Sequence, residues 1–201
     1  LKESGIGYTV FDETVPNPTV RNVEDARALY IKHNCSGIIG FGGGSAMDCA
    51  KIVGARIAKP RKSVMQIKGL FRILHRLPFT IAVPTTAGTG SETTATALIT
   101  DGDTHHKFTI NDLSLIPHAV VLDPEVTRTL PPHITATTGM DALTHAVEAY
   151  IGRSTVKSTR ADAVRAVQMI CGNLESAYRD GNNMDARKNM LLASFYAGRS
   201  F

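Results

Sequence analysis

The chain has 201 residues, 43% of them hydrophobic and 20% charged, with a formal net charge of +4, as expected for a globular protein of one or two domains. Few aromatic residues and a single short basic run, Lys59 to Lys62, argue against nucleic-acid binding, and no apolar run is long enough to span a membrane. Three widely spaced cysteines, Cys35, Cys49 and Cys171, indicate neither a disulfide framework nor a zinc ribbon and predict a cytoplasmic setting.

The two ends of the chain predict that the sequence is a fragment. Leu1 to Gly5 has the pattern of a helix tail stopped by glycine, and the strand-like Tyr8 to Phe11 follows at once. No initiating methionine is present. The other end, Leu191 to Phe201, stops inside an apolar helical pattern without a cap.

The first third of the chain alternates between helix and strand patterns. The segment Pro16-Asn17-Pro18 predicts an extended turn that leaves the Asn17 side chain available for a polar contact. A helix capped by Asn22 and reaching about His33 follows, then an apolar strand at 37–41 and a helix at 45–58. This alternation predicts a parallel sheet.

A glycine-rich turn, Gly42 to Asp48, joins that strand to that helix. Its three glycines let the backbone approach a bulky anion, and Ser45 and the first N–H groups of the helix point at the same place. A pyrophosphate would suit this turn, although an ordinary tight turn accounts for the glycines equally well. Asp48 suits a helix cap or dipole partner better than a catalyst, but it could also reach a ribose.

A second polar loop follows the next strand. Residues 59–77 are basic and irregular and predict a short helix packed over the sheet, and residues 78–83 predict a strand. The loop Pro84 to Glu92 then concentrates hydroxyls and glycines at the carboxyl end of that strand, where ligands bind in open α/β sheets. Such loops are often merely solvated, but two of them after successive strands favour a shared nucleotide site.

A hairpin is predicted next, with strands at 93–100 and 107–110. His105 and His106 lie near its turn and are expected to face solvent. Lys107 either reaches the nucleotide site or is exposed, and spacing alone leaves both alternatives open.

The strand pattern ends with the segment 119–122, which Asp123 terminates. Only helices are predicted beyond it: a short one at 125–130, one opened by Pro131-Pro132, one at 155–178 and one beginning at Asn183. The domain boundary is therefore placed near Asp123.

The helix around Gly139 to Tyr150 carries the second candidate site. Its large apolar residues form a stripe and its alanines cover most of the rest, which predicts burial nearly all round: Leu143, Val147, Tyr150 and Ile151 in the stripe, Ala142, Ala146 and Ala149 elsewhere.

Three ionisable residues of this helix, Asp141, His145 and Glu148, fall within a sector of roughly 60°. Asp141 and His145 are good metal ligands one turn apart, and a carboxylate with an imidazole suits Fe, Zn, Mn or Ni. The alternative is that Asp141 caps the helix and His145 is a hydrogen-bonded core histidine; spacing alone favours neither.

Four motifs in this order resemble the iron-containing (group III) alcohol dehydrogenase family: Pro16-Asn17-Pro18, Gly42 to Asp48, Pro84 to Glu92, and Gly139 to Glu148. The resemblance implies an α/β fold of the dehydroquinate synthase-like type. Residues 1–123 would form a Rossmann-like parallel-sheet domain that binds the dinucleotide, and residues 124–201 would begin an all-α metal-binding domain. In the family, two further histidine ligands follow the last residue of this chain and one strand precedes Leu1.

The resemblance also implies roles for individual residues. Two would bind the metal: Asp141 and His145. Three would hold the pyrophosphate: Gly43, Gly44 and Ser45. Three would line the cofactor: Thr85, Thr86 and Thr89. Three more match ribose or nicotinamide-side contacts: Asn17, Asp48 and Lys107.

The expected function is therefore metal-dependent oxidoreduction between a small alcohol and its aldehyde or ketone. The cofactors would be NAD or NADP, with NAD favoured, and a divalent metal, with Fe²⁺ favoured and Zn²⁺ as the alternative. A homodimer or higher homo-oligomer is expected, and no general base is identified. The alternatives are a metal- and NAD-dependent lyase of the dehydroquinate synthase type and a non-catalytic nucleotide-binding fragment.

Overall fold

The protein is described by a computed structural model covering residues 1–153 and 155–200. It divides into two compact units, each assembled from separate stretches of chain. The first unit comprises Leu1–Gly40, Ser45–Ile81 and Ala95–Ala119, and the second comprises Phe41–Gly44, Ala82–Thr94 and the chain from Val120 onward. The domain limits expected at residues 123 and 124 stay a prediction. Phe201, where the sequence predicts a helix still running, lies outside the described residues.

The helices and strands follow most of the predicted order, with differences at residues 8–11 and 59–77. They are η1 (Lys2–Ser4), α1 (Val20–Lys32), β1 (Gly37–Gly42), α2 (Gly44–Ala58), η2 (Met65–Ile67), β2 (Gly69–Leu70), β3 (Phe79–Pro84), β4 (Thr96–Thr100), β5 (Lys107–Asn111), η3 (Leu113–Leu115), β6 (Ala119–Val120), η4 (Pro124–Thr127), α3 (Pro132–Ile151), α4 (Lys157–Arg179) and α5 (Met184–Ser200). Within the described residues, none of the helices has the length and hydropathy needed to cross a bilayer.

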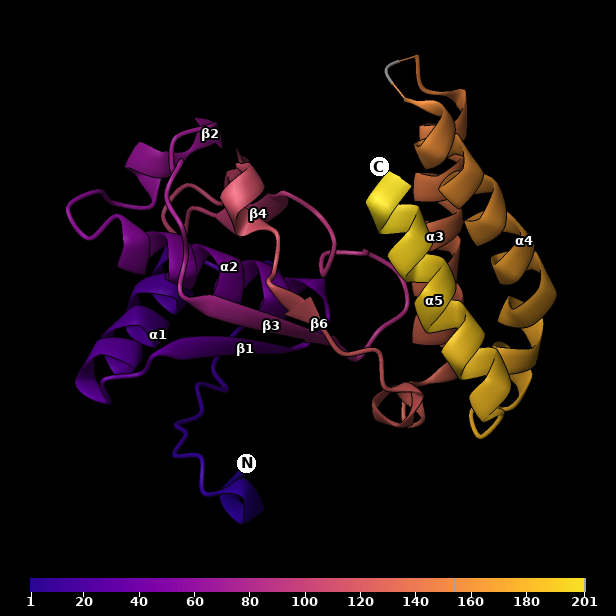
Figure 1. Ribbon diagram of the computed structural model, residues 1–201, viewed down its shortest axis with the longest axis horizontal. Coiled ribbons are helices and arrows are strands. Elements are labelled where there is room, and N and C mark those ends of the chain that lie inside the picture. Colours follow the sequence, from indigo (N-terminus) through magenta and orange to yellow (C-terminus); the bar gives the residue numbers. More distant parts are fainter. Residues whose placement is uncertain (154, 201) are drawn as a thin grey trace. The chain divides into compact units, whose positions relative to one another are not determined.

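The predicted parallel sheet is confirmed, with strand order β1-β3-β6. Two backbone hydrogen bonds show that β3 and β6 are parallel: His118 N–H donates to Thr80 O and Val121 N–H donates to Ala82 O, so residue numbers increase in the same direction along both strands. In Figure 1, α1 and α2 lie beside β1 and β3. The approach of α2 to β1 is close, because a Cβ on Gly40 would lie 3.2 Å from the Ala50 Cβ.

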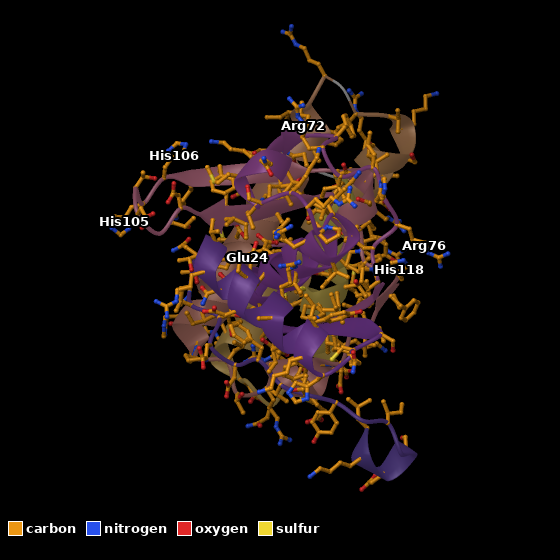
Figure 2. The ribbon with its side chains drawn as sticks, turned by 90° about the vertical axis from the view of Figure 1, so that its left-hand side faces the viewer. Glu24, Arg72, Arg76, His105, His106 and His118 are labelled. Atoms are coloured by element: carbon orange, nitrogen blue, oxygen red, sulfur yellow. The ribbon has the colours of Figure 1, made fainter. Side chains whose placement is uncertain are left out.

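A second sheet has the order β2-β5-β4, and β4 and β5 form the predicted antiparallel hairpin. His105 and His106 project from its turn and are exposed, as expected (Figure 2). The short helix predicted to pack over the sheet within residues 59–77 is wrong in part. That segment forms η2 and the edge strand β2, and it leaves Leu70 and Phe71 exposed.

The buried Asp112 carboxylate holds this segment. It accepts hydrogen bonds from the backbone N–H groups of Ile73 (2.9 Å) and Leu74 (3.0 Å) and from Ser114. Burial by itself raises the pKa of Asp112, but the hydrogen bonds from Ser114, Leu74 and Ile73 outweigh it, and the pKa lies below its ordinary value.

Two local predictions near the start of the chain are corrected. Helix α1 begins earlier than expected, because Thr19 is its N-cap and forms a capping box with Asn22. The segment Tyr8 to Phe11 forms no strand. A strand requires a pairing partner as well as a suitable pattern, and the described residues form no ladder with this segment.

In the second unit, α3, α4 and α5 pack side by side around a core rich in alanine (Figure 1). The prediction that α3 is buried nearly all round is wrong in part. Val147, Tyr150 and Ile151 are exposed by 43%, 53% and 71%, whereas the alanines at 142, 146 and 149 are buried. Small side chains let helix backbones approach closely, so the neighbouring helices take the alanine face.

Candidate cofactor loops and metal-ligating helix

The turn after β1 has the geometry of an anion-binding turn. Gly42 has φ 146°, a conformation that favours glycine, and α2 starts two residues later at Gly44. The N–H groups of the first turn of α2 have no acceptor within the helix and carry the positive end of its dipole. This turn can therefore receive a phosphate group.

The Asn17 loop lies against that first turn, within the first unit. The Asn17 backbone N–H donates to the Ser45 Oγ at 3.2 Å, and Asn17 itself has φ 59°. A hydroxyl that accepts one hydrogen bond keeps its own proton to donate. The binding roles expected of Asn17 and Ser45 stay predictions.

The hydroxyl-rich loop lies beside the glycine turn, within the second unit. The Thr85 N–H donates to Gly42 O at 2.9 Å, and Thr85, Thr86 and Thr89 are all half-buried. The Thr89 Oγ1 also accepts from the Ser91 N–H at 3.3 Å. The two loops that follow successive strands are thus adjacent, as the parallel sheet predicts.

The glycines at 43 and 44 differ in what the fold demands of them. A Cβ on Gly44 would lie 2.9 Å from both the Cγ2 and the Oγ1 of Thr89, so the protein's own packing excludes a side chain there. A Cβ on Gly43 would lie 3.5 Å from Thr86, which is ordinary contact. Packing therefore explains Gly44 but not Gly43, and the bare surface at Gly43 fits the close approach of a phosphate.

The predicted contacts of Asp48 and Lys107 stay predictions. The Asp48 carboxylate accepts a hydrogen bond from the Leu98 N–H at 2.9 Å and so joins α2 to β4, while Lys107 is exposed on β5. Sequence reasoning missed Lys51. It is 1% exposed, and its Nζ donates to Thr96 O at 2.9 Å. A lysine on an otherwise apolar helix face was the available signal.

The predicted metal ligands, Asp141 and His145, lie near the middle of α3. The Asp141 Oδ1 and the His145 Nε2 are 3.8 Å apart, and the two side chains are 45% and 22% exposed. Two bonds of about 2.1 Å at a tetrahedral angle would place the donors roughly 3.4 Å apart, so a small rotation lets both bind one ion. The helix-cap alternative for Asp141 is excluded, since α3 begins at Pro132.

Asp141 and His145 would supply two ligands to a metal ion. Among residues 1–153 and 155–200, no group of three or more His, Cys, Asp or Glu side chains is arranged to hold a metal ion. Glu148, which shares the helical sector of the pair, is exposed and does not complete such a group. A carboxylate and an imidazole nevertheless fit a divalent first-row metal.

The hydroxyl-rich loop also rests on α3, which the sequence did not reveal. A Cβ on Gly88 would lie 2.7 Å from the Thr138 Cβ and 2.8 Å from the Thr138 backbone oxygen. Ala87 belongs to the same apolar core as Ala142 and Ala146. The loop expected to line the cofactor and the helix expected to bear the metal ligands are thus in direct contact.

These features define the class of protein: an α/β fold with a parallel sheet and two adjacent polar loops at its carboxyl edge, followed by a helical bundle with a carboxylate–imidazole pair. The pattern described as "Iron-containing alcohol dehydrogenase" matches residues 1–124, and the pattern "Fe-containing alcohol dehydrogenase family, C-terminal" matches residues 135–201. The chain belongs to the iron-containing alcohol dehydrogenase family.

Individual relatives agree with that assignment. The chain is 40% identical to a choline dehydrogenase of Bacillus subtilis (strain 168), covering all of the chain and 50% of that protein. Its fold matches a crystal structure of 1,3-propanediol oxidoreductase, with TM-score 0.95, 39% identity and coverage of 100% of the chain and 52% of the other.

A third match is a sulfoacetaldehyde reductase from Bifidobacterium kashiwanohense in complex with NAD⁺, with TM-score 0.88, 33% identity and coverage of 96% and 52%. The chain spans about half the length of the curated relatives it matches. Family and fold are therefore established for a chain that covers half of such a protein.

Proposed function

We propose that the polypeptide carrying this chain is a metal-dependent oxidoreductase that interconverts a small alcohol and its aldehyde or ketone with a nicotinamide cofactor. One observation carries the proposal: the loop with Thr85, Thr86 and Thr89 packs directly on the helix that bears Asp141 and His145. A dinucleotide loop next to a helix with potential metal ligands would bring a nicotinamide and a Lewis acid to the same substrate.

Each group of residues has a task in this proposal. The turn at Gly43 and Gly44 holds the pyrophosphate through backbone N–H groups, and the threonine hydroxyls orient the adjoining part of the cofactor. Asp141 and His145 hold the metal. When bound, the metal supplies a Lewis acid that stabilises the alkoxide form of the alcohol, and the nicotinamide supplies the hydride acceptor.

The family match favours this reaction over a lyase of the dehydroquinate synthase type. We further propose NAD over NADP and Fe²⁺ over Zn²⁺; the NAD⁺ complex of the sulfoacetaldehyde reductase supports the first choice. We also propose a homo-oligomer, since the exposed apolar side chains of Val147, Tyr150 and Ile151 offer surface that association would bury. A cytoplasmic location is proposed from the three free, widely spaced cysteines. Light scattering measures the oligomeric state.

The test of the reaction uses the natural-length polypeptide. It is stripped of metal, reconstituted anaerobically with Fe²⁺ or with Zn²⁺, and supplied with NAD⁺ or NADP⁺ and short primary alcohols. Reduction of the cofactor should require both the alcohol and the metal, because the alkoxide must be stabilised for hydride to leave. Folded protein that binds NADH and metal but turns over no alcohol or aldehyde would contradict the proposed reaction.

A further inference from the structure

The hydroxyl-rich loop is seated on the helical bundle through two glycines. Gly88 faces Thr138 of α3, where a Cβ would meet the Cβ, O and Cα of Thr138 at 2.7, 2.8 and 3.0 Å. Gly90, with φ 60°, faces α5, where a Cβ would lie 2.6 Å from the Gly198 Cα. Backbone therefore approaches backbone at both points, and a rotamer change cannot relieve a larger residue at either one.

The first of these contacts lies one helical turn from the metal pair. Thr138 precedes Asp141 by three residues, a rise of about 4.5 Å along α3. The Thr138 Oγ1 donates to Ile134 O at 2.8 Å, so this side chain is held on its own helix. Ala87, next to Gly88, is buried among the inward alanines of α3. The hydroxyl-rich loop can therefore move only if α3 moves with it or if the contact between them is broken.

We propose that the Gly88–Thr138 contact is a positioning element that couples the cofactor loop to the metal pair, so that nucleotide and metal influence each other's binding. The inference rests on the proposed function, because it requires both ligands to bind. Coupling between sites travels through contiguous packed elements, and it is reciprocal. A contact with only a structural role would alter stability or both affinities but leave their mutual dependence unchanged.

The experiment measures that dependence without turnover. NADH is titrated by fluorescence into the natural-length polypeptide with and without saturating Zn²⁺, and the ratio of the two Kd values is the coupling factor. We expect a factor of about fivefold or more in the native protein. Gly88→Ala should bring the factor close to one, because the new methyl group forces the loop away from α3.

The matched control is Gly172→Ala, since a Cβ at this position on α4 meets nothing within 4 Å. It should keep the native coupling factor. Thr138→Gly removes the side chain on the α3 side of the same contact and introduces no clash. It should also lower the coupling factor, and it replaces Gly88→Ala in the test if that variant fails to fold.

The outcomes are separable. Native coupling in Gly88→Ala, or in Thr138→Gly if the first variant does not fold, would overturn the inference. A native protein that binds NADH and Zn²⁺ independently would also overturn it and would leave the proposed function standing. A native protein that binds neither ligand would refute the proposed function and the coupling with it.

Discussion

Substitutions of Gly43 and Gly44 distinguish a glycine required by the packing of the protein from a glycine required for cofactor binding. A Cβ at Gly44 would lie 2.9 Å from two atoms of Thr89. Because Thr89 is β-branched, rotating its side chain leaves at least one heavy atom facing the new methyl group. Rotation would also break the hydrogen bond from the Ser91 N–H. Gly44→Ala should therefore destabilise the protein by about 1–3 kcal/mol.

Removing the Thr89 side chain should remove the destabilisation caused by Gly44→Ala. In a Thr89→Ala background the closest remaining atom is the Cβ of residue 89, at 3.3 Å, which can give by a few tenths of an ångström. Gly44→Ala should then be nearly neutral, so that the double-mutant cycle shows an interaction energy of about 1–3 kcal/mol. Urea unfolding of the four proteins measures it. An equal cost in both backgrounds would refute the clash argument.

Gly43→Ala tests whether cofactor binding requires a glycine at this position. Its Cβ would make only ordinary contact with Thr86, at 3.5 Å, so stability should change by less than about 0.5 kcal/mol. The same methyl group would occupy the space that a phosphate needs, and the Kd for NADH should rise at least about tenfold, or about 1.4 kcal/mol. Unchanged NADH affinity in folded Gly43→Ala would show that the turn binds no phosphate.

The remaining predictions concern the metal pair, the buried carboxylate and the cysteines. His145→Ala should lose most of the bound metal, by metal analysis, and keep its circular dichroism, because a ligand is exchanged for a strong helix former. Asp112→Asn should cost about 1–3 kcal/mol near neutral pH. Hydrogen bonds outweigh burial and lower the pKa of Asp112. The carboxylate's contribution to stability is therefore present above about pH 4 and is lost as the pH falls through the folded-state pKa. The difference in unfolding free energy between Asp112→Asn and the native protein should accordingly become smaller in acid. Burial raises the pKa of the Cys49 thiol to about 11, and iodoacetamide should therefore modify the exposed Cys171 well before Cys49, as mass spectrometry of digests will show.

The metal prediction has a control variant, and the Asp112 and cysteine predictions each have an outcome that would contradict them. His133→Ala, an exposed histidine on the same helix, should keep full metal content. A pH-independent stability difference for Asp112→Asn would mean that the carboxylate is not the ionised acceptor. Modification of Cys49 at the rate of Cys171 would contradict its burial at 2% exposure.

What the sequence determines by itself is the local part of this protein. Strand and helix patterns predict β1, α2, β3 and the β4–β5 hairpin, because side-chain periodicity and turn residues act over a few neighbours. The order of the four motifs points to the family. The helical spacing of Asp141 and His145 places their side chains together, because one turn of an α-helix brings residues i and i+4 to the same face.

Only the tertiary structure decided which surfaces meet. The sequence pattern predicted that α3 is buried nearly all round, but α4 and α5 pack on its alanine face and leave Val147, Tyr150 and Ile151 exposed. The buried face of a helix depends on its neighbours. Tyr8 to Phe11 has a strand pattern without a strand, because pairing is a non-local requirement. The need for glycine at 44, and the seating of Gly88 on Thr138, come from residues distant in sequence, and periodicity carries no information about such contacts.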